Sequence, residues 1–281
     1  MKLFELNDNI IETIGDGGYQ YELAVHKTVS AAAVQGLNPG DKPAAGYSPH
    51  GAGDIEASFN GKPFNVEVKL NKKAQMGGGS VKYDRSSGNV LASEKLAASA
   101  DAADLSLILS AVKSKIPQMD QYLDALSEIE PKSIHKEYAN AGIPFVSSKD
   151  ARSQLKKSGH HKAINSIVML SAKHISNMYN SKGVYYIQIG GAGLFYMGKN
   201  PLNLPVPEFV GEARVEIRLG FAGDTQGTTT SGFNKKIGNT GTPIPARRAE
   251  VRCLARLLTS SSSPYTLDSV DSIQKLFGTS K

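Results

Sequence analysis

The sequence predicts a mixed α/β fold, and the order of its segments is the main reason. A segment with apolar residues at helical spacing comes first, and two short segments with alternating apolar and polar residues follow it. Helical and strand-like segments then continue to the C-terminus. A chain of 281 residues can bury a substantial core, and no internal repeat or obvious linker divides it. We therefore expect a single domain over residues 1–281.

The first predicted helix follows Gly17 and Gly18 and ends near Gly36. Its apolar side chains recur three and four residues apart, which places them on one helical face: Tyr21, Val25, Thr28, Val29 and Ala32. Residues 37–53 are rich in Gly and Pro, which indicates a loop.

Two short strands are predicted next, at residues 54–59 and 64–70. The sequence NGKP joins them, and an Asn-Gly pair between two such segments is a strong hairpin signal. On the second strand Asn65, Glu67 and Lys69 alternate with apolar residues, so one face should enter the core and the other a cleft or water.

The remaining segments are predicted from glycine content and periodicity. Glycine-rich residues 74–89 and Gly/Thr/Asn-rich residues 222–243 indicate loops. Residues 91–130 and 160–180 are predicted to be helical, and the C-terminus to carry a capped helix within 266–278. Three further strands are predicted, at 184–190, 194–198 and 214–221.

Composition limits the possible functions. The formal net charge of +6 and the pI near 9.2 are compatible with an anionic partner. The absence of Trp argues against a platform that stacks single-stranded bases. A single cysteine, Cys253, excludes an internal disulfide and a cysteine-based metal site. No apolar run is long enough to cross a bilayer, and the N-terminus does not resemble a signal peptide, so we expect a cytoplasmic protein.

The hairpin carries the residues with the clearest chemical meaning. Asp54 and Glu67 are separated by twelve residues across one tight turn, so both carboxylates can face the same point. Two such carboxylates repel each other unless a cation lies between them, and Mg²⁺ is commonly held in this way. Lys69 would point to the same place, where its ammonium could orient a water or stabilise a phosphate oxygen. These are the groups that metal-assisted phosphodiester hydrolysis requires.

An alternative remains open at the hairpin. Charged residues at alternating positions also occur on an ordinary solvated face, where Glu67 and Lys69 would be surface charges. Glu56 shares the face of Asp54, and we expect it to be a surface residue.

The pattern Asp54-x12-Glu67-x-Lys69 resembles the signature of the PD-(D/E)XK nuclease superfamily, which includes restriction endonucleases, resolvases and phage exonucleases. The resemblance implies a restriction-endonuclease-like αβββαβ core with a mixed sheet, a helical insertion and additional C-terminal strands. The core would span about 17–75 and 160–200, the insertion about 90–158, and a basic C-terminal region 205–281.

The resemblance also implies roles for individual residues. Asp54 and Glu67 would bind Mg²⁺, for which Mn²⁺ would substitute, with the carbonyl of Val68 as a further ligand. Lys69 would be the catalytic lysine and Glu22, on the first helix, an auxiliary acid. Gly53 departs from the family's pattern, which has proline before the aspartate.

Basic segments outside the hairpin are candidates for DNA contact. Flexible Lys and Arg side chains can follow a duplex and release counterions. The candidates are Lys72, Lys73, Gln75, Lys235, Lys236, Arg247 and Arg248. A simple turn at Gln75 and an ordinary basic surface loop around 234–252 are the alternatives.

The sequence therefore predicts an Mg²⁺-dependent endodeoxyribonuclease that acts on double-stranded DNA and is of restriction or phage type. A homodimer would suit a double-strand cutter. A non-catalytic DNA-binding protein and a structural or assembly protein on the same fold are the alternatives. The recognition sequence is left open.

Overall fold

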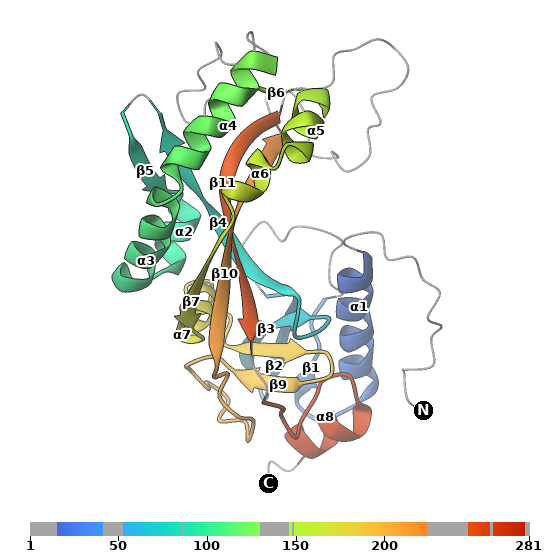
Figure 1. The fold of residues 1–281 in the computed structure, drawn as a ribbon. Helices are drawn as coiled ribbons and strands as arrows, with labels where there is room; N and C mark the ends of the chain where they lie inside the picture. Colours follow the sequence, from blue (N-terminus) through green and yellow to red (C-terminus); the bar gives the residue numbers. More distant parts are fainter. Residues whose placement is uncertain are drawn as a thin grey trace. The chain divides into compact units, whose positions relative to one another are not determined.

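The computed structural model describes residues 16–41, 53–85, 87–129, 146–147, 149–223, 247–258 and 261–278 (Figure 1). The chain divides into two compact units. Unit 1 comprises Met1–Gln75, Ser171–Glu212 and Leu257–Lys281, and unit 2 comprises Met76–Leu170 and Ala213–Arg256. The single domain expected over 1–281 stays a prediction. Within the described ranges, no helix combines the length and apolarity needed to cross a membrane.

Unit 1 is built on a five-stranded mixed sheet. All neighbouring strands pair antiparallel except β3 and β8, which are parallel. Because parallel strands need a crossover, the chain must leave the sheet between them, and α7 (Lys173–Asn180) lies on the return path. In spatial order the strands are β1 (Leu37–Asn38), β2 (Ile55–Phe59), β3 (Lys62–Lys69), β8 (Tyr186–Ile189) and β9 (Gly193–Tyr196).

The predicted hairpin is confirmed. β2 and β3 pair antiparallel from Ile55 opposite Val66 to Phe59 opposite Lys62. Asn60 and Gly61 form the turn with φ values of 49° and 76°, the left-handed conformation that a tight two-residue hairpin turn requires. The apolar residues of β3 are buried and alternate with partly exposed polar ones, as expected: Phe64, Val66 and Val68.

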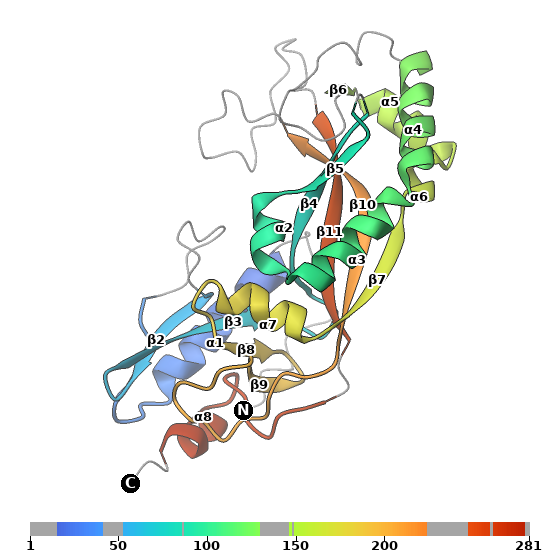
Figure 2. The same cartoon turned by 90° about the vertical axis from the view of Figure 1, so that its left-hand side faces the viewer.

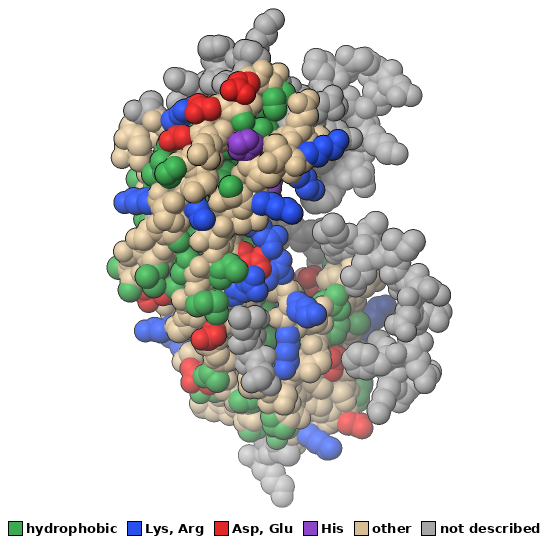
Figure 3. Space-filling model, viewed as in Figure 1, with side chains coloured by type: hydrophobic (Ala, Val, Ile, Leu, Met, Phe, Trp, Pro, Cys, Tyr) green, Lys and Arg blue, Asp and Glu red, His purple; other side chains and the backbone are tan. Residues whose placement is uncertain are grey.

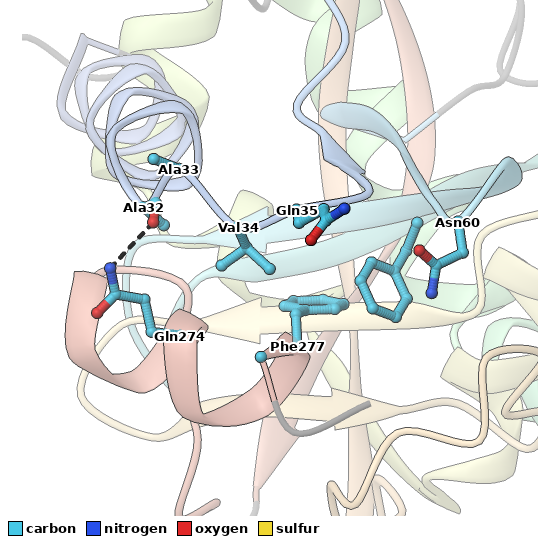
Figure 4. Close-up of a pocket in the computed structure, with 9 residues that line it drawn as sticks. Ala32, Ala33, Val34, Gln35, Asn60, Gln274 and Phe277 are labelled. Carbon is cyan, nitrogen blue, oxygen red and sulfur yellow. Dashed lines mark hydrogen bonds between the residues drawn. The ribbon is translucent and has the colours of Figure 1, made fainter. Parts of the chain in front are cut away.

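Two helices cover the apolar face of this sheet. On α1 (Asp16–Ala31) and the residue after it, the predicted stripe is confirmed, because Val25, Val29 and Ala32 pack in the core. The predicted C-terminal helix is also confirmed as α8 (Val270–Phe277), which Ser269 caps by accepting a hydrogen bond from an N–H of its first turn. Gln274 of α8 donates to the Ala32 carbonyl at 3.0 Å (Figure 4).

A pocket of about 530 Å³ opens where α1 and α8 meet the hairpin turn (Figure 4). Its walls are apolar groups and the amides of Gln35, Asn60 and Gln274. The pocket lies at the turn end of β2 and β3, whereas the carboxylates predicted to bind a metal lie at the opposite end of these strands.

Unit 2 is built on a second sheet. Its main order is β5 (Asn89–Ala92), β4 (Gln75–Asp84), β11 (Arg247–Leu258), β10 (Glu212–Gly223) and β7 (Ser166–Ser171), and β6 (Val146–Ser147) pairs with β11. The predicted strand at 214–221 is confirmed within β10. Most of the predicted 222–243 loop lies outside the described residues.

The loop predicted at 74–89 is wrong, because most of it forms β4. The glycines that suggested a loop are sites of close approach. A Cβ at Gly78 would lie 2.4 Å from the carbonyl oxygen of Cys253 on β11, and one at Gly79 would lie 2.6 Å from the Cβ of Leu96. Small residues are therefore needed in this strand for packing rather than for turning.

The helix predicted over 160–180 is also only partly right. It is divided into α6 (His160–Ala163), strand β7 and α7. The sequence of β7, SIVMLS, has alternating burial and pairs with β10, so tertiary pairing decides a short apolar run that periodicity leaves ambiguous.

The helical prediction for 91–130 is confirmed from residue 94 onward. The helices are α2 (Glu94–Ser99), α3 (Ala102–Lys113) and α4 (Ile116–Ile129), and α5 (Lys149–Lys157) follows them. In Figure 2, α2 and α3 lie in front of the strands of the second sheet. In α4, four apolar residues at helical spacing are buried, Met119, Tyr122, Leu123 and Leu126, and Ile129 at the same spacing is half-buried.

Candidate active site

The hairpin brings Asp54 and Glu67 together. Asp54 directly precedes β2, and one further step in the register from the Ile55–Val66 pair places it opposite Glu67. Directly opposed residues share a face, with Cβ atoms about 4.5–5.5 Å apart. The Val68 N–H donates to Asp54 Oδ2 at 2.8 Å, which holds this carboxylate against β3.

Gly53 is buried and leaves no room for a side chain. A Cβ at this position would lie 2.7 Å from the Val66 carbonyl oxygen and 3.0 Å from the Val66 nitrogen. The main chain before Asp54 therefore approaches β3 more closely than a larger residue permits. This contact accounts physically for glycine at the position where the resembled signature has proline.

Lys69 lies against Glu67. Its Nζ is 2.5 Å from Glu67 Oε1, and the two side chains are 17% and 13% exposed. Burial acts to lower the pKa of Lys69, but Glu67, Asp54 and Glu22 together outweigh it and hold that pKa above its ordinary value. Lys69 is therefore a cation at neutral pH.

Glu22 reaches the same group of charges from α1. Burial, then Asp54, raises the pKa of Glu22 to about 7, against the lowering effect of Lys69. The pKa of Asp54 is raised to about 6 by burial and by Glu67, although Lys69 and the Val68 hydrogen bond oppose this shift. The helix and the hairpin thus bring three carboxylates and one lysine within electrostatic reach of one another.

This surplus of negative charge suits a divalent cation. Among the residues that the structure describes, no group of three or more His, Cys, Asp or Glu side chains is arranged to hold a metal. The hairpin offers two carboxylates and the main chain of Val68, which are hard oxygen donors. Mg²⁺ usually takes one or two protein carboxylates and keeps several waters, so these donors fit it.

Tyr179 is a site residue that the sequence did not indicate. It lies on α7 at 2% exposure, and its hydroxyl donates to Glu67 Oε1 at 3.0 Å. Burial, and then the charge of Glu67, raises the pKa of Tyr179 well above its ordinary value, so the hydroxyl keeps its proton. Nζ of Lys182 lies 5.5 Å from the centre of the Tyr179 ring. In the sequence, the one indication of a role for Tyr179 was its place in a predicted helix just before a predicted strand.

Gln188 is a second residue that the sequence did not single out. It is fully buried in β8, in register with Val68. Its Nε2 donates to Tyr21 Oη at 3.1 Å and to Thr266 Oγ1 at 2.9 Å, and its Oε1 accepts from the Leu267 N–H at 2.9 Å. The bond to Tyr21 connects β8 to α1 at the residue directly before Glu22. An amide within the otherwise apolar segment VYYIQIG was the available signal.

The predicted DNA-contact residues near the hairpin lie just after β3. Lys72 and Lys73 are in the turn that follows this strand, where the Lys73 N–H donates to Asn71 Oδ1 at 2.8 Å. Gln75 is the first residue of β4 and is exposed. Glu56 is exposed, as expected.

The distal basic candidates fall differently. Arg247 and Arg248 begin β11, where they pair with Ser147 and Val146 of β6, so their predicted position on a loop is wrong. The strand partner decides their conformation. Lys235 and Lys236 lie outside the described residues.

Comparisons with known proteins give little to set beside this geometry. No family model matches the chain, and no curated protein matches it. Among solved structures it is similar to HhaI endonuclease in complex with DNA, at 12% identity, with 91% of this chain and 96% of that chain covered and a TM-score of 0.37.

Proposed function

We propose that this chain is an Mg²⁺-dependent deoxyribonuclease that hydrolyses phosphodiester bonds of double-stranded DNA. The observation that carries the proposal is the arrangement of Asp54, Glu67 and Lys69: two opposed carboxylates on a hairpin, with a lysine ammonium 2.5 Å from one of them. On an ordinary solvated face the charged side chains would be exposed, whereas Glu67 and Lys69 are largely buried and Glu67 contacts the buried Tyr179.

The topology of unit 1 supports a restriction-endonuclease-like core. Helix α1 is followed by β1, β2 and β3, and α7 then leads into β8, which runs parallel to β3. With the elements of unit 2 between β3 and α7 left aside, this order supports the helix–three strands–helix–strand core that the resemblance to the PD-(D/E)XK superfamily implies. Glu67 and Lys69 are on β3, and Asp54 directly precedes β2, which agrees with the arrangement that the signature implies.

Each carboxylate is held through one oxygen. Val68 N–H contacts Oδ2 of Asp54, whereas Tyr179 and Lys69 both contact Oε1 of Glu67. We therefore assign Oδ1 of Asp54 and Oε2 of Glu67, with the carbonyl of Val68, as the donors to Mg²⁺ or Mn²⁺. The bound ion would lower the pKa of a water and stabilise charge on the phosphate.

The remaining side chains act through charge and hydrogen bonding. Lys69 serves as a cation rather than a base, because its pKa is raised. Its ammonium can donate to the attacking water and to a phosphate oxygen whose charge grows in the transition state. Glu67 and Asp54, with a smaller contribution from Glu22, keep Lys69 in this charged form, and Tyr179 orients Glu67.

The test is cleavage of supercoiled and linear plasmid DNA with Mg²⁺ or with EDTA. We expect Lys69→Ala to lower the cleavage rate by about 10²–10³-fold, the usual effect of losing one donor to a transition state. The matched control is Lys62→Ala, an exposed lysine at the other end of β3, which should cut like the wild type.

The absence of cutting by the wild type with Mg²⁺ or Mn²⁺ on duplex, branched or single-stranded DNA would overturn the proposal. DNA retention without cutting would then favour a non-catalytic DNA-binding protein.

A further inference from the structure

Three arginines surround one carboxylate in unit 2. The group consists of Arg214, Glu216 and Arg218 on β10 and Arg256 on β11 and is called the arginine cluster below. Arg214 Nε lies 3.5 Å and Arg256 Nε 3.4 Å from Glu216 Oε1, and Arg218 contacts Oε2. We propose that the arginine cluster binds the phosphate backbone of DNA; the choice of DNA as ligand rests on the proposed function.

Alternation along the strands places the cluster on one face of the second sheet. On β10 its members alternate with buried apolar residues, Ala213, Val215, Ile217 and Leu219. On β11 the buried residues are Val251, Cys253 and Ala255, so Arg252 shares the face of Arg256. In Figure 3, Lys and Arg side chains gather near the middle of the view, where β10 and β11 lie in Figure 1.

The exposures show a carboxylate beneath and guanidinium groups above it. The Glu216 side chain is 10% exposed, whereas those of Arg214, Arg218 and Arg256 are 40%, 47% and 31% exposed. Contact with one shared carboxylate restricts the arginine rotamers, so less conformational entropy is lost when a ligand binds.

The charge of the cluster is not balanced by its own carboxylate. Three guanidinium groups and one Glu216 carry a formal charge of about +2, and about +1 remains when Glu212, on the same face of β10, is counted as well. One arginine would suffice to neutralise a partly buried carboxylate, and the further arginines repel one another. An anion at this face removes that repulsion, and guanidinium groups match phosphate geometry well.

The three guanidinium groups converge on one carboxylate, so the arginine cluster is a compact cationic site. Such a site suits one or two adjacent phosphates of a duplex backbone, because guanidinium groups pair with phosphate oxygens through several hydrogen bonds. The contacts would be to the backbone, so we expect affinity without sequence preference.

The test is equilibrium binding of the full chain to short duplexes of different sequence, in EDTA and over a salt series. In the double variant Arg214→Gln/Arg218→Gln, contacts to one or two phosphates are lost. We expect the slope of log K against log salt to fall by about 1–2, with affinity at low salt reduced about tenfold or more for every duplex.

Two further variants serve as controls. Lys95→Gln/Lys113→Gln removes the same charge from exposed positions on α2 and α3 and should leave the slope unchanged. Arg214→Lys/Arg218→Lys keeps the charge and should retain most of the slope. A folded Gln double variant with wild-type affinity and slope would overturn the inference, because the cluster would then be only a structural ion-pair group. Failure of the wild type to bind any duplex would also overturn it.

A second measurement removes the dependence on folding of the variant. Phenylglyoxal modification of the wild type, followed by peptide mass analysis, should show Arg214 and Arg218 protected by duplex DNA. Equal modification with and without DNA would contradict the inference. A cleavage assay separates the two proposals. If the protein cuts DNA but DNA does not protect the arginine cluster, only the inference about the cluster is disproved. If DNA protects the cluster but the protein never cuts, only the nuclease activity is disproved.

Discussion

Replacing Asp54 by Asn should stabilise the metal-free protein at alkaline pH. The amide oxygen of the Asp54→Asn side chain can still accept the Val68 N–H, so the variant removes the charge and keeps this hydrogen bond. In the wild type, burial and Glu67 raise the pKa of Asp54 from 3.8 to about 6. Ionising Asp54 therefore opposes folding, because the charge is more favourable in the unfolded chain.

The shift sets the size and sign of the effect. A shift of about two pKa units corresponds to about 3 kcal/mol. Because Asp54 titrates together with the carboxylates around it, part of this free energy belongs to them, and we expect the substitution to change the free energy of unfolding by an amount on the order of 1–3 kcal/mol. A raised pKa contributes stability that is complete below the unfolded value near 4 and is lost as pH rises through about 6. The variant should thus be more stable than the wild type at about pH 8 and lose this advantage at about pH 4.

Urea unfolding in EDTA at both pH values measures the effect. Glu56→Gln, an exposed acid on the same hairpin, is the control and should change little. Added Mg²⁺ should stabilise the wild type by mass action at about pH 8 and stabilise Asp54→Asn much less. A variant that is less stable than the wild type at about pH 8, or equally stabilised at both pH values, would refute the electrostatic reasoning.

Two further predictions concern neighbouring residues. Tyr179→Phe removes a donor to Glu67 Oε1, and we expect metal affinity and cleavage rate to fall about 10–100-fold. A metal titration and initial cleavage rates measure the effect. Unchanged values would show that Tyr179 does not orient Glu67. Gly53→Ala forces a Cβ against the Val66 carbonyl and should destabilise the protein by about 1–3 kcal/mol in thermal or urea unfolding. Gly18→Ala, on α1 with open space around it, should instead be neutral or stabilising, and equal losses at the two positions would count against the steric argument.

Local signals were sufficient for the hairpin and for α1. The Asn60-Gly61 turn and the alternation along β3 depend only on neighbouring residues, so the position of Glu67 opposite Asp54 could be predicted from sequence. Tyr179 could not, because it is 112 residues from Glu67 along the chain and meets it only through tertiary structure.

The errors arose where packing partners decide the conformation. Gly78 is in a strand because β11 approaches its backbone, and a single sequence shows only the glycine. The run at 166–171 is apolar enough for a helix or a strand, and its pairing with β10 selects the strand. Glu216 was not singled out from the sequence, and one of its arginine partners, Arg256, comes from a different strand.

The crossover between β3 and β8 has a consequence for the order of folding. Lys69 and Ile189 pair across a long stretch of chain, most of which belongs to unit 2. Closing a loop of this length carries an entropy cost of about 4 kcal/mol, so contacts across it should form late. Once unit 2 is folded, the free part of the loop is much shorter and closure becomes easier. The stability of unit 2 should therefore affect how quickly Tyr179 reaches Glu67, although neither residue belongs to that unit.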